Sequence, residues 1–391
     1  MGPLEGTRVL DLSKYGPCRY CSSMLGDLGA EVIAVETPKA DSQVPDIVSD
    51  DTAMLYIGHN RSKKSITLNL KMEEGREILY RLVDKVDVLI EASRPGVLKR
   101  RGMDYETLSK LNERLIYCSV TGYGQDGPYA QRSGHEINFS GISGVLALTG
   151  SRDGPPMYLQ SPSIADLLGG VTQAVIAITA ALFSREKTGE GQYIDVSITD
   201  GTIFYHWLDG QQYLTNGSLP LRSESSTGSD MACMNVYKAG DDKYFTIGCF
   251  EPWLWANLCK LTGKEEFVDT QFDLSRQAEM YEAFSEVFAN RDRDEWVRLL
   301  DEADVSSGPV YDLGEVFSDP HFRHRKATVA VEHPRLGKIE ILNTPFKFSR
   351  TPAEVRGRPP LHGEHTREIL SNLLGYSEEQ LLKLIESGVI D

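Results

Sequence analysis

The first 124 residues alternate short apolar stretches with amphipathic ones, and this alternation limits the fold more than any other feature of the sequence. Four stretches are typical of buried strands: "RVLDL" (8–12), "EVIAVE" (31–36), "DVLIEA" (87–92) and "LIYCSVTGYG" (115–124). The segments 21–29, 73–86 and 105–111 between them have helical spacing. Strands alternating with helices of this length form a parallel sheet with right-handed crossovers. The sequence therefore predicts the α/β class, with a large doubly wound domain.

Composition shifts along the chain predict a second, smaller domain. Residues 165–189 form the strongest predicted helix, which is apolar on nearly every side and therefore expected to be buried. The polar stretch 212–232 resembles a linker, and "MNVYKAGDDKYFTIGCF" after it predicts a hairpin that turns at 240–242. We expect residues 1–211 to form the first part of the large domain and 212–232 to be the linker. Residues 233–335 should form a small α+β domain, and 336–391 should return to the large domain.

The acidic composition narrows the class of partner. A formal net charge of −16 argues against nucleic acid and anionic membranes. No run of 18 or more apolar residues predicts a membrane span, and the start lacks a secretory pattern, so we expect a cytoplasmic protein. Cys18 and Cys21 form the only C-x-x-C, which predicts reduced thiols and no metal site.

The sequence disfavours two common enzyme classes, the nicotinamide-dependent dehydrogenases and the serine hydrolases. The loop "SKYGPCRYC" (13–21) after the first predicted strand lacks the spaced glycines that let a backbone approach a dinucleotide pyrophosphate. No G-x-S-x-G motif indicates a serine hydrolase.

Two titratable residues are candidates for chemistry. Asp166 begins the long apolar helix, where it is either a plain N-cap or part of a site that stabilises an anion at free N–H groups. Gly169 and Gly170 would let a ligand approach that helix end. His135 lies beside Glu136 in "RSGHEINFSG" (132–141), as either a structural histidine or a general base. We expect Glu136 to be an orienting or surface acid.

Basic residues gather in "NRSKK" (60–64) and "RPGVLKRR" (94–101). Both groups are expected near the carboxyl ends of strands, where open α/β sheets bind ligands. In so acidic a chain they are the places where a phosphate-rich ligand could bind, although a solvated surface is the alternative.

Several motifs together resemble a known family over nearly the whole chain. They are "LGDLGAEVIAVE", "HNRSKKSITLNLK", "VDVLIEASRPGVLKRRGMDYETL", "LIYCSVTGYGQDGPY", "SGHEINFSGISGVLALTG", "ADLLGG", "TGEGQYIDVSITDG" and "LHGEHTREIL". The chain resembles the family III CoA-transferase (CaiB/BaiF) superfamily. The resemblance implies a large Rossmann-like domain and a small domain, in an interlocked homodimer. It also implies an acyl-CoA thioester as the ligand, with coenzyme A as part of the substrate and no further cofactor. It places CoA along the large domain, and we expect its phosphates to bind Arg61, Lys63, Lys64, Lys71, Arg94 and Arg100.

Within that superfamily the resemblance implies one of two chemistries. In the transferases, an aspartate matching Asp166 attacks a CoA thioester and forms an aspartyl-CoA intermediate. In the α-methylacyl-CoA racemases, Asp166 and a histidine matching His135 exchange the α-proton of a 2-methylacyl-CoA on its two faces. The N–H groups at the start of the helix would then stabilise the enolate.

Three features favour the racemase branch. "SGHEIN" resembles its Gly-His-Asp stretch, "TIGCFEPWLW" resembles its glutamate-proline segment with Glu251, and the glycine-rich lid of several transferases is absent. The resemblance gives Glu251 a part in the hydrogen-bond network of the site. The sequence departs from the family pattern at Glu136, which replaces an aspartate, and at Ala92 and Ser93, which replace Asn-Phe.

Overall fold

The computed structural model describes residues 1–14, 16–41, 50–151, 153–222 and 231–391. The chain forms two compact units. The first unit contains Met1–Val145, Tyr158–Tyr205 and Arg323–Asp391, and the second contains Leu146–Met157 and His206–Phe322. Each unit is described by itself.

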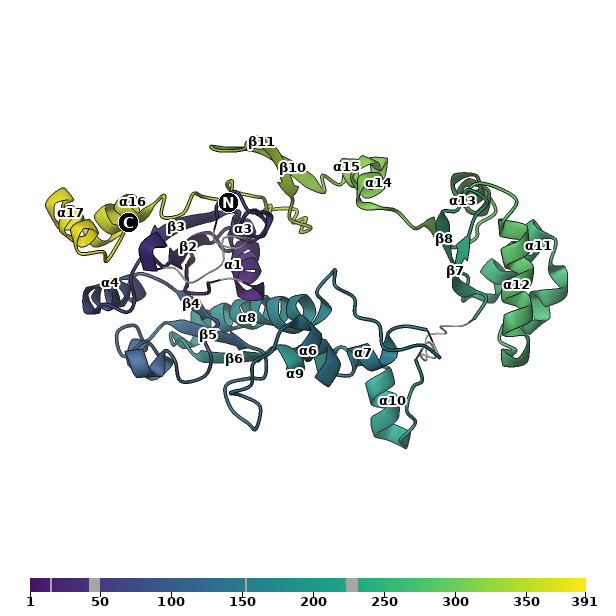
Figure 1. Cartoon of the computed structure of the whole chain (residues 1–391), viewed down its shortest axis with the longest axis horizontal. Coiled ribbons are helices and arrows are strands. Elements are labelled where there is room, and N and C mark those ends of the chain that lie inside the picture. Colours follow the sequence, from purple (N-terminus) through teal and green to yellow (C-terminus); the bar gives the residue numbers. More distant parts are fainter. Residues whose placement is uncertain (15, 42–49, 152, 223–230) are drawn as a thin grey trace. The chain divides into compact units, whose positions relative to one another are not determined.

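A six-stranded parallel sheet is the centre of the first unit (Figure 1). Its strands are β1 (Arg8–Asp11), β2 (Glu31–Glu36), β3 (Lys63–Thr67), β4 (Val88–Glu91), β5 (Ile116–Thr121) and β6 (Tyr193–Ser197). They lie in the order β3-β2-β1-β4-β5-β6, which is the Rossmann order. The predicted large α/β domain with a parallel sheet is confirmed.

Helices cover both faces of this sheet and enclose two apolar cores. One core packs α1 (Pro17–Asp27) and α8 (Gln173–Thr188) against side chains such as Val9, Val88 and Cys118. The other packs α4 (Glu73–Val83), α16 (Thr366–Leu374) and α17 (Glu378–Glu386) against the opposite face. Both faces are buried, as a parallel sheet requires.

Shorter elements connect these layers in the first unit. They are η1 (Lys39–Asp41), α3 (Met54–Asn60), η2 (Lys99–Arg101), α5 (Tyr105–Leu108), α6 (Glu136–Ile142), η3 (Ala165–Thr172), α9 (Ile198–Phe204), β10 (Thr328–His333) and β11 (Gly337–Leu342). Two short helices, α7 (Val145–Leu148) and α15 (Pro320–His324), span the boundaries between the units.

The basic segment 60–64 lies at the opposite end of the sheet from the one we predicted. Asn60 ends α3 and Lys63 begins β3, so the segment is at the amino end of a strand and not near a carboxyl end. The strand "KKSIT" begins with two lysines, and this polar start hides it from a search for apolar runs.

The long apolar helix is buried on one side only. Ala174, Ile178 and Leu182 pack in the core, whereas Ile176 and Phe183 are 53% and 66% exposed. The combined helix Ala165–Thr188 is apolar and long enough to cross a membrane by composition, and 44% of its apolar window is buried. The expectation that every side of this helix is buried was therefore wrong.

The second unit is a small α+β structure, as predicted. Its antiparallel sheet contains β7 (Met234–Lys238), β8 (Tyr244–Gly248) and β9 (Ser307–Pro309), and β7 and β8 form the expected hairpin. Its other elements are α10 (Asp209–Asn216), α11 (Pro252–Thr262), η4 (Glu265–Thr270), η5 (Leu274–Arg276), α12 (Gln277–Phe288), α13 (Arg293–Glu302) and α14 (Leu313–Ser318).

The unit boundaries differ from the expected domain boundaries. The predicted linker 212–232 begins inside α10, and its residues 223–230 lie outside the described residues. The second unit ends at Phe322, so residues 323–335 belong with the large unit, and 146–157 belong with the small one.

Candidate active site

A cavity of about 370 Å³ opens at the carboxyl ends of β1, β4 and β5. Its walls are residues 16–18 after β1, residues 92, 94 and 95 after β4, and residues 120–123 at the end of β5. Residues 130 and 132–135, with Phe139, Asp166 and Ile198, complete it, and all lining residues belong to the first unit. We call it the Asp166 cavity. It lies at the edge of the sheet where open α/β folds bind ligands.

Asp166 is held in place through its backbone by Glu136. Glu136 is 7% exposed, and its two carboxylate oxygens accept the N–H groups of Ala165 (3.1 Å) and Asp166 (2.7 Å). The hydroxyl of Ser140 donates a third hydrogen bond to it at 2.6 Å. Glu136 is thus a buried anchor for the start of η3 and is not a surface acid.

The same arrangement changes the acidity of Asp166. Burial raises the pKa of the Asp166 carboxyl to about 7, and the negative charge of Glu136 contributes in the same direction. The carboxyl group can therefore gain or lose a proton near neutral pH. Asp166 lies one residue inside η3, after the N-cap Ile164, so the plain N-cap interpretation is wrong.

His135 is the N-cap residue of α6, and its side chain is exposed at the cavity wall. Its backbone N–H donates to Oδ1 of Asn138 at 3.1 Å, which fixes the chain just before the helix. The structure thus brings His135 and Asp166 to one cavity, although 30 residues separate them.

Small residues around His135 make room for an aromatic ring. A Cβ atom at Gly134 would lie 2.5 Å from the ring of Phe139, and one at Gly122 would lie 2.2 Å from it. Phe139 is buried beneath the His135 loop, where Tyr123 packs edge-on at 5.3 Å between centroids. The glycines of this low-propensity stretch therefore let the loop close onto the end of β5.

Gly169 and Gly170 have a different role from the one we expected. A Cβ atom at Gly169 would lie 2.3 Å from the carbonyl oxygen of Ile198, and one at Gly170 would lie 3.1 Å from the Ile198 side chain. Both glycines are buried against α9. They serve the close crossing of two helices and do not expose the start of η3 to a ligand.

Three of the predicted phosphate ligands already have acidic partners. Arg61 is buried against Asp27 at 2.8 Å, and Lys63 is buried against Asp11 at 3.3 Å. Lys64 bridges Glu31 and Glu368 at the other end of the sheet. Removing a buried cation from its carboxylate is costly, so the segment 60–64 serves the fold in this structure.

The other predicted basic residues lie where a ligand could reach them. Arg94 is exposed at the Asp166 cavity and donates to Ser133 at 2.6 Å, while Arg100 is exposed in η2 and Lys71 is exposed after β3. Lys14, which we had not predicted, follows β1. Its pKa is lowered by partial loss of solvent and then by the positive charges of Arg101 and Lys71.

The charges of Lys71 and Arg101 lower the pKa of Lys14, so both side chains lie close enough to Lys14 to interact with it. We treat the three residues as one cluster of positive charge. Lys14 closely follows the predicted strand 8–12, and Arg101 belongs to the basic group 94–101, so the sequence held a signal for these two. Lys71 follows β3, a strand that the sequence did not predict.

Glu251 belongs to the second unit, where it precedes α11 as its N-cap residue and is half-buried. It is not among the residues that line the Asp166 cavity.

Cys18 lines the Asp166 cavity and is buried, and burial raises the pKa of its thiol well above the usual range. Of the two departures from the family pattern, Ala92 lines the cavity, whereas Ser93 does not and forms hydrogen bonds to Glu91 through its backbone N–H (2.7 Å) and its side chain.

A Rossmann-ordered sheet with a half-buried acid, Asp166, and a histidine at its carboxyl edge defines an α/β protein equipped for proton or acyl transfer. The chain belongs to CoA-transferase family III, whose model matches residues 4–366. This confirms the expected superfamily, and the protein is an enzyme of the family III CoA-transferase and racemase group.

Relatives of both chemistries are similar to this chain. Human succinyl-CoA:glutarate CoA-transferase is 32% identical over 401 residues, covering 100% of this chain and 90% of the relative. Human alpha-methylacyl-CoA racemase is 32% identical over 394 residues, covering 99% and 97%. The crystal structure of a CAIB/BAIF family protein from Brucella suis matches with a TM-score of 0.83 and 32% identity, covering 95% of this chain and 99% of that one.

Proposed function

We propose that the protein is a racemase of 2-methylacyl-CoA thioesters. The observation that carries this proposal is that one cavity is lined both by Asp166, whose pKa is raised to about 7, and by the imidazole of His135. A general base works best when its pKa is near the operating pH. A carboxyl group with an ordinary pKa would be a weak base toward an α-proton.

The proposed reaction is a proton exchange at the α-carbon. One of the two residues removes the α-proton and leaves an enolate on the thioester, and the other residue returns a proton to the opposite face. For the reverse direction the two residues exchange roles. CoA enters only as part of the substrate in this proposal, and no other cofactor takes part.

The enolate oxygen needs hydrogen-bond donors. The N–H groups of Ala165 and Asp166 were our expected donors, but the carboxylate of Glu136 occupies both of them. The start of α1 offers a second set, because Gly16 and Cys18 line the cavity and each has a backbone N–H group, whereas Pro17 between them has none. The N-cap residue Gly16 has no side chain that could occupy these donors. We therefore assign the donors to the first turn of α1, whose dipole also favours negative charge.

The phosphates of CoA require positive charge in this acidic chain. Lys14, Lys71 and Arg101 supply it after β1 and β3 and in η2, with Arg94 at the Asp166 cavity itself. A nucleotide bound at the cluster would direct its thioester arm toward Asp166 along the same edge of the sheet. We keep Arg100 as a further candidate because it is exposed in the same 3-10 turn.

The second candidate function is CoA transfer between carboxylic acids. The transferase relatives support it, since they match this chain at the same identity as the racemases. In that reaction the carboxylate of Asp166 attacks the thioester carbonyl and expels the CoA thiolate, which gives a mixed anhydride. The thiolate then attacks the aspartyl carbonyl and releases the free acid, leaving CoA bound to Asp166 as a thioester.

One experiment separates the two functions. A chiral 2-methylacyl-CoA is incubated with the enzyme in deuterated water, with and without a free carboxylic acid. Racemisation predicts deuterium at the α-carbon without the acid, and loss of turnover by about a hundredfold or more in both Asp166→Asn and His135→Ala. Transfer instead predicts CoA on the added acid, a hydroxylamine-trapped Asp166 and an active His135→Ala variant, and that outcome would replace the racemase proposal.

We also propose that the enzyme is a cytoplasmic homodimer. The family resemblance and the exposed apolar side chains of α8 support the dimer. Glu251 would then take part in the hydrogen-bond network of the site, as the resemblance implies.

A further inference from the structure

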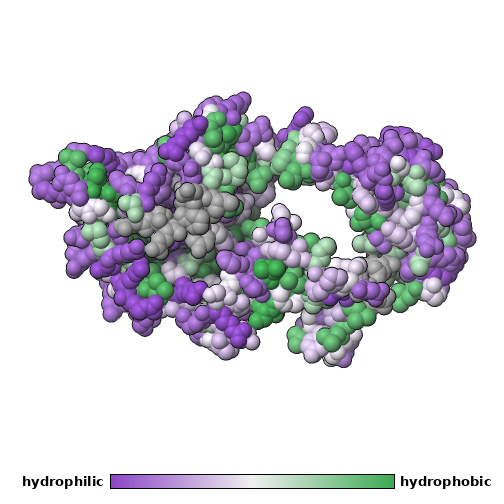
Figure 2. Space-filling view, viewed as in Figure 1, coloured by the Kyte–Doolittle hydropathy of each residue, from purple (hydrophilic) through white to green (hydrophobic). Residues whose placement is uncertain are grey.

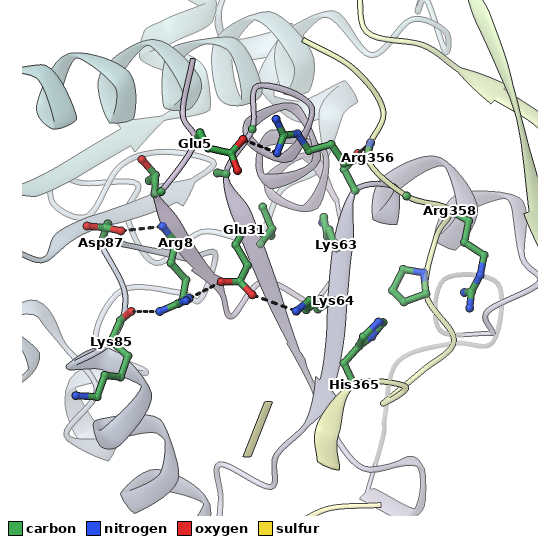
Figure 3. A pocket seen from close by; sticks show the side chains of 18 residues that line it. Glu5, Arg8, Glu31, Lys63, Lys64, Lys85, Asp87, Arg356, Arg358 and His365 are labelled. Carbon is green, nitrogen blue, oxygen red and sulfur yellow. Dashed lines mark hydrogen bonds and ion pairs between the residues drawn. The ribbon is translucent and has the colours of Figure 1, made fainter. Parts of the chain in front are cut away.

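The first unit has a second pocket, larger than the Asp166 cavity, at the opposite end of its sheet (Figure 3). Its volume is about 740 Å³, within the range of small-molecule sites. Five segments line it: 5–8 before and at the start of β1, 29–32 at β2, 62–64 at β3, 85–87 before β4, and 356–365 of the C-terminal region. We call it the amino-end pocket because it lies where these strands begin.

Cations dominate the wall of this pocket. Six lysine and arginine residues and three acidic residues line it, in a chain whose formal net charge is −16. They are Arg8, Lys63, Lys64, Lys85, Arg356 and Arg358, with Glu5, Glu31 and Asp87. Two of these residues already have ion-pair partners outside the pocket wall: Lys63 binds Asp11, and Asp87 binds Arg185.

The remaining cations are held in place by acids but keep spare donors. Glu31 lies between Arg8 (2.7 Å) and Lys64 (3.2 Å), and Glu5 holds Arg356 at 2.8 Å (Figure 3). Arg358, Lys64 and Lys85 also bind Glu364, Glu368 and Asp84. A guanidinium has five N–H donors and an ammonium has three, so these pairs leave several N–H groups directed to solvent.

The histidine on the wall adds another donor. The N–H of Ser65 donates to Nδ1 of His365 at 3.2 Å, so in the neutral ring Nε2 carries the hydrogen. The wall is therefore rich in donors and poor in free acceptors. Among the described residues of the wall, Ala30, Val32 and Pro360 have apolar side chains, and the charged and polar side chains outnumber them.

We propose that the amino-end pocket binds a small polyanion with two or more phosphate or carboxylate groups. Such a ligand supplies the acceptors that the wall lacks, and charge-assisted hydrogen bonds to several cations at once are the strong ones. The ion pairs in the wall are about one-third exposed and individually weak, so a multivalent anion can compete with Glu5 and Glu31.

The ligand would also connect the ends of the chain. Arg356 and Arg358 belong to the C-terminal segment, whereas Arg8 starts β1 and Lys64 lies in β3. One anion bound between them would hold that segment on the sheet. Binding should therefore raise the melting temperature, because a ligand that binds only the folded chain stabilises it.

The experiment is a titration of the full-length protein with pyrophosphate and, separately, with propane-1,2,3-tricarboxylate, in low salt and with saturating CoA. Saturating CoA occupies the substrate site, so the remaining binding reports the amino-end pocket. We expect one anion per chain and a higher melting temperature. The tighter of the two probes assigns phosphate or carboxylate as the preferred group.

Three variants test the location. Lys64→Gln with Arg356→Gln should weaken binding at least about tenfold, because two charge-assisted contacts are lost. Glu31→Gln should tighten binding severalfold, since it removes the acid that competes for Arg8 and Lys64. Lys383→Gln on α17, whose lysine is exposed and paired only with Glu379, should change nothing.

Glu31→Gln protects the test from a folding artefact, because loss of structure cannot produce tighter binding. Absence of binding by either probe, displacement of the probe by CoA, or equal affinity in wild type and Glu31→Gln would overturn the proposal. The wall cations would then serve only to hold the C-terminal segment. None of these outcomes affects the assignment of Asp166 and His135.

Discussion

Glu136 controls Asp166 through both position and charge. In Glu136→Gln the amide oxygen can still accept one N–H group, but the negative charge that raises the pKa of Asp166 is gone. The pH at which α-proton exchange reaches half its maximum should therefore shift below that of the wild type. The measurement is deuterium incorporation from pH 5 to 9.

Ser140→Ala is the matched control for this variant. It removes the hydroxyl that donates to Glu136 but keeps the carboxylate charge, so the midpoint of its profile should stay near that of the wild type. Equal midpoints for Glu136→Gln and the wild type would show that the charge of Glu136 does not act on the catalytic proton.

The half-buried carboxyl group of Asp166 should lower the free energy of unfolding at alkaline pH. Its pKa is raised from 3.8 to about 7 in the folded protein, so ionisation is harder there than in the unfolded chain. The contribution of this group to the free energy of unfolding is complete below pH 4 and is lost as pH rises through 7. Asp166→Asn should therefore gain stability relative to the wild type as pH rises from 5 to 8, by at most about 3 kcal/mol, since about two pH units of the shift lie in this range.

Thermal unfolding of both proteins at pH 5 and pH 8 checks this. The difference in melting temperature should be larger at pH 8. A difference that is constant with pH would mean that Asp166 titrates at an ordinary pKa, and the acid–base argument would lose its support.

The residues of the site could be predicted from the sequence better than their hydrogen bonds and packing contacts. Asp166 and His135 carry chemistry that a reader of sequence recognises, and the structure places both on one cavity. The carboxylate of Glu136 accepts hydrogen bonds from backbone N–H groups about 30 residues away, and Gly122 lies against Phe139. Neither contact leaves a local pattern in the sequence. Such contacts depend on the path of the chain, which periodicity does not describe.

At the scale of elements, we expect the phosphates of CoA to bind Lys14 and Arg101, because Arg61 and Lys63 are occupied by buried ion pairs. Lys14→Gln with Arg101→Gln should raise the dissociation constant for CoA by about tenfold or more and flatten its dependence on salt, because two phosphate contacts are lost. The measurement is a CoA titration at two ionic strengths.

The control for this prediction is again Lys383→Gln, which removes one exposed positive charge from α17. It should leave CoA affinity unchanged. Unaltered affinity in the double variant as well would exclude the cluster as the phosphate site and return attention to Arg94 and Arg100.

Strands with a continuous apolar centre were predicted within a few residues, as for β2, which matches residues 31–36. The strand β3 was missed because two of its five residues are lysines, and their side chains turn inward to Asp11 or along the sheet edge to Glu31. The exposed face of α8 was also missed, since an apolar residue has the same appearance in the sequence whether or not it is covered.

At the scale of the whole molecule, that exposed face leads to the last prediction. η3 contacts both α8 and α9, and each of the three elements exposes large apolar side chains. The exposed fraction is between 40% and 73% for Leu168, Ile176, Phe183, Ile203 and Phe204. In the second unit, α10 exposes Tyr213 and Leu214, and apolar residues are visible on its surface in Figure 2. Monomeric proteins seldom leave so many large apolar groups in water.

We therefore expect the protein to be a homodimer at micromolar concentration, with these faces covered. Light scattering should give twice the chain mass of 43.5 kDa. Ile176→Glu with Phe183→Glu should shift this mass toward the monomer, because two buried charges without partners oppose association. Leu382→Glu, an exposed leucine of α17, is the matched control and should remain dimeric. A monomeric wild type with full activity would contradict both the dimer and the part assigned to α8.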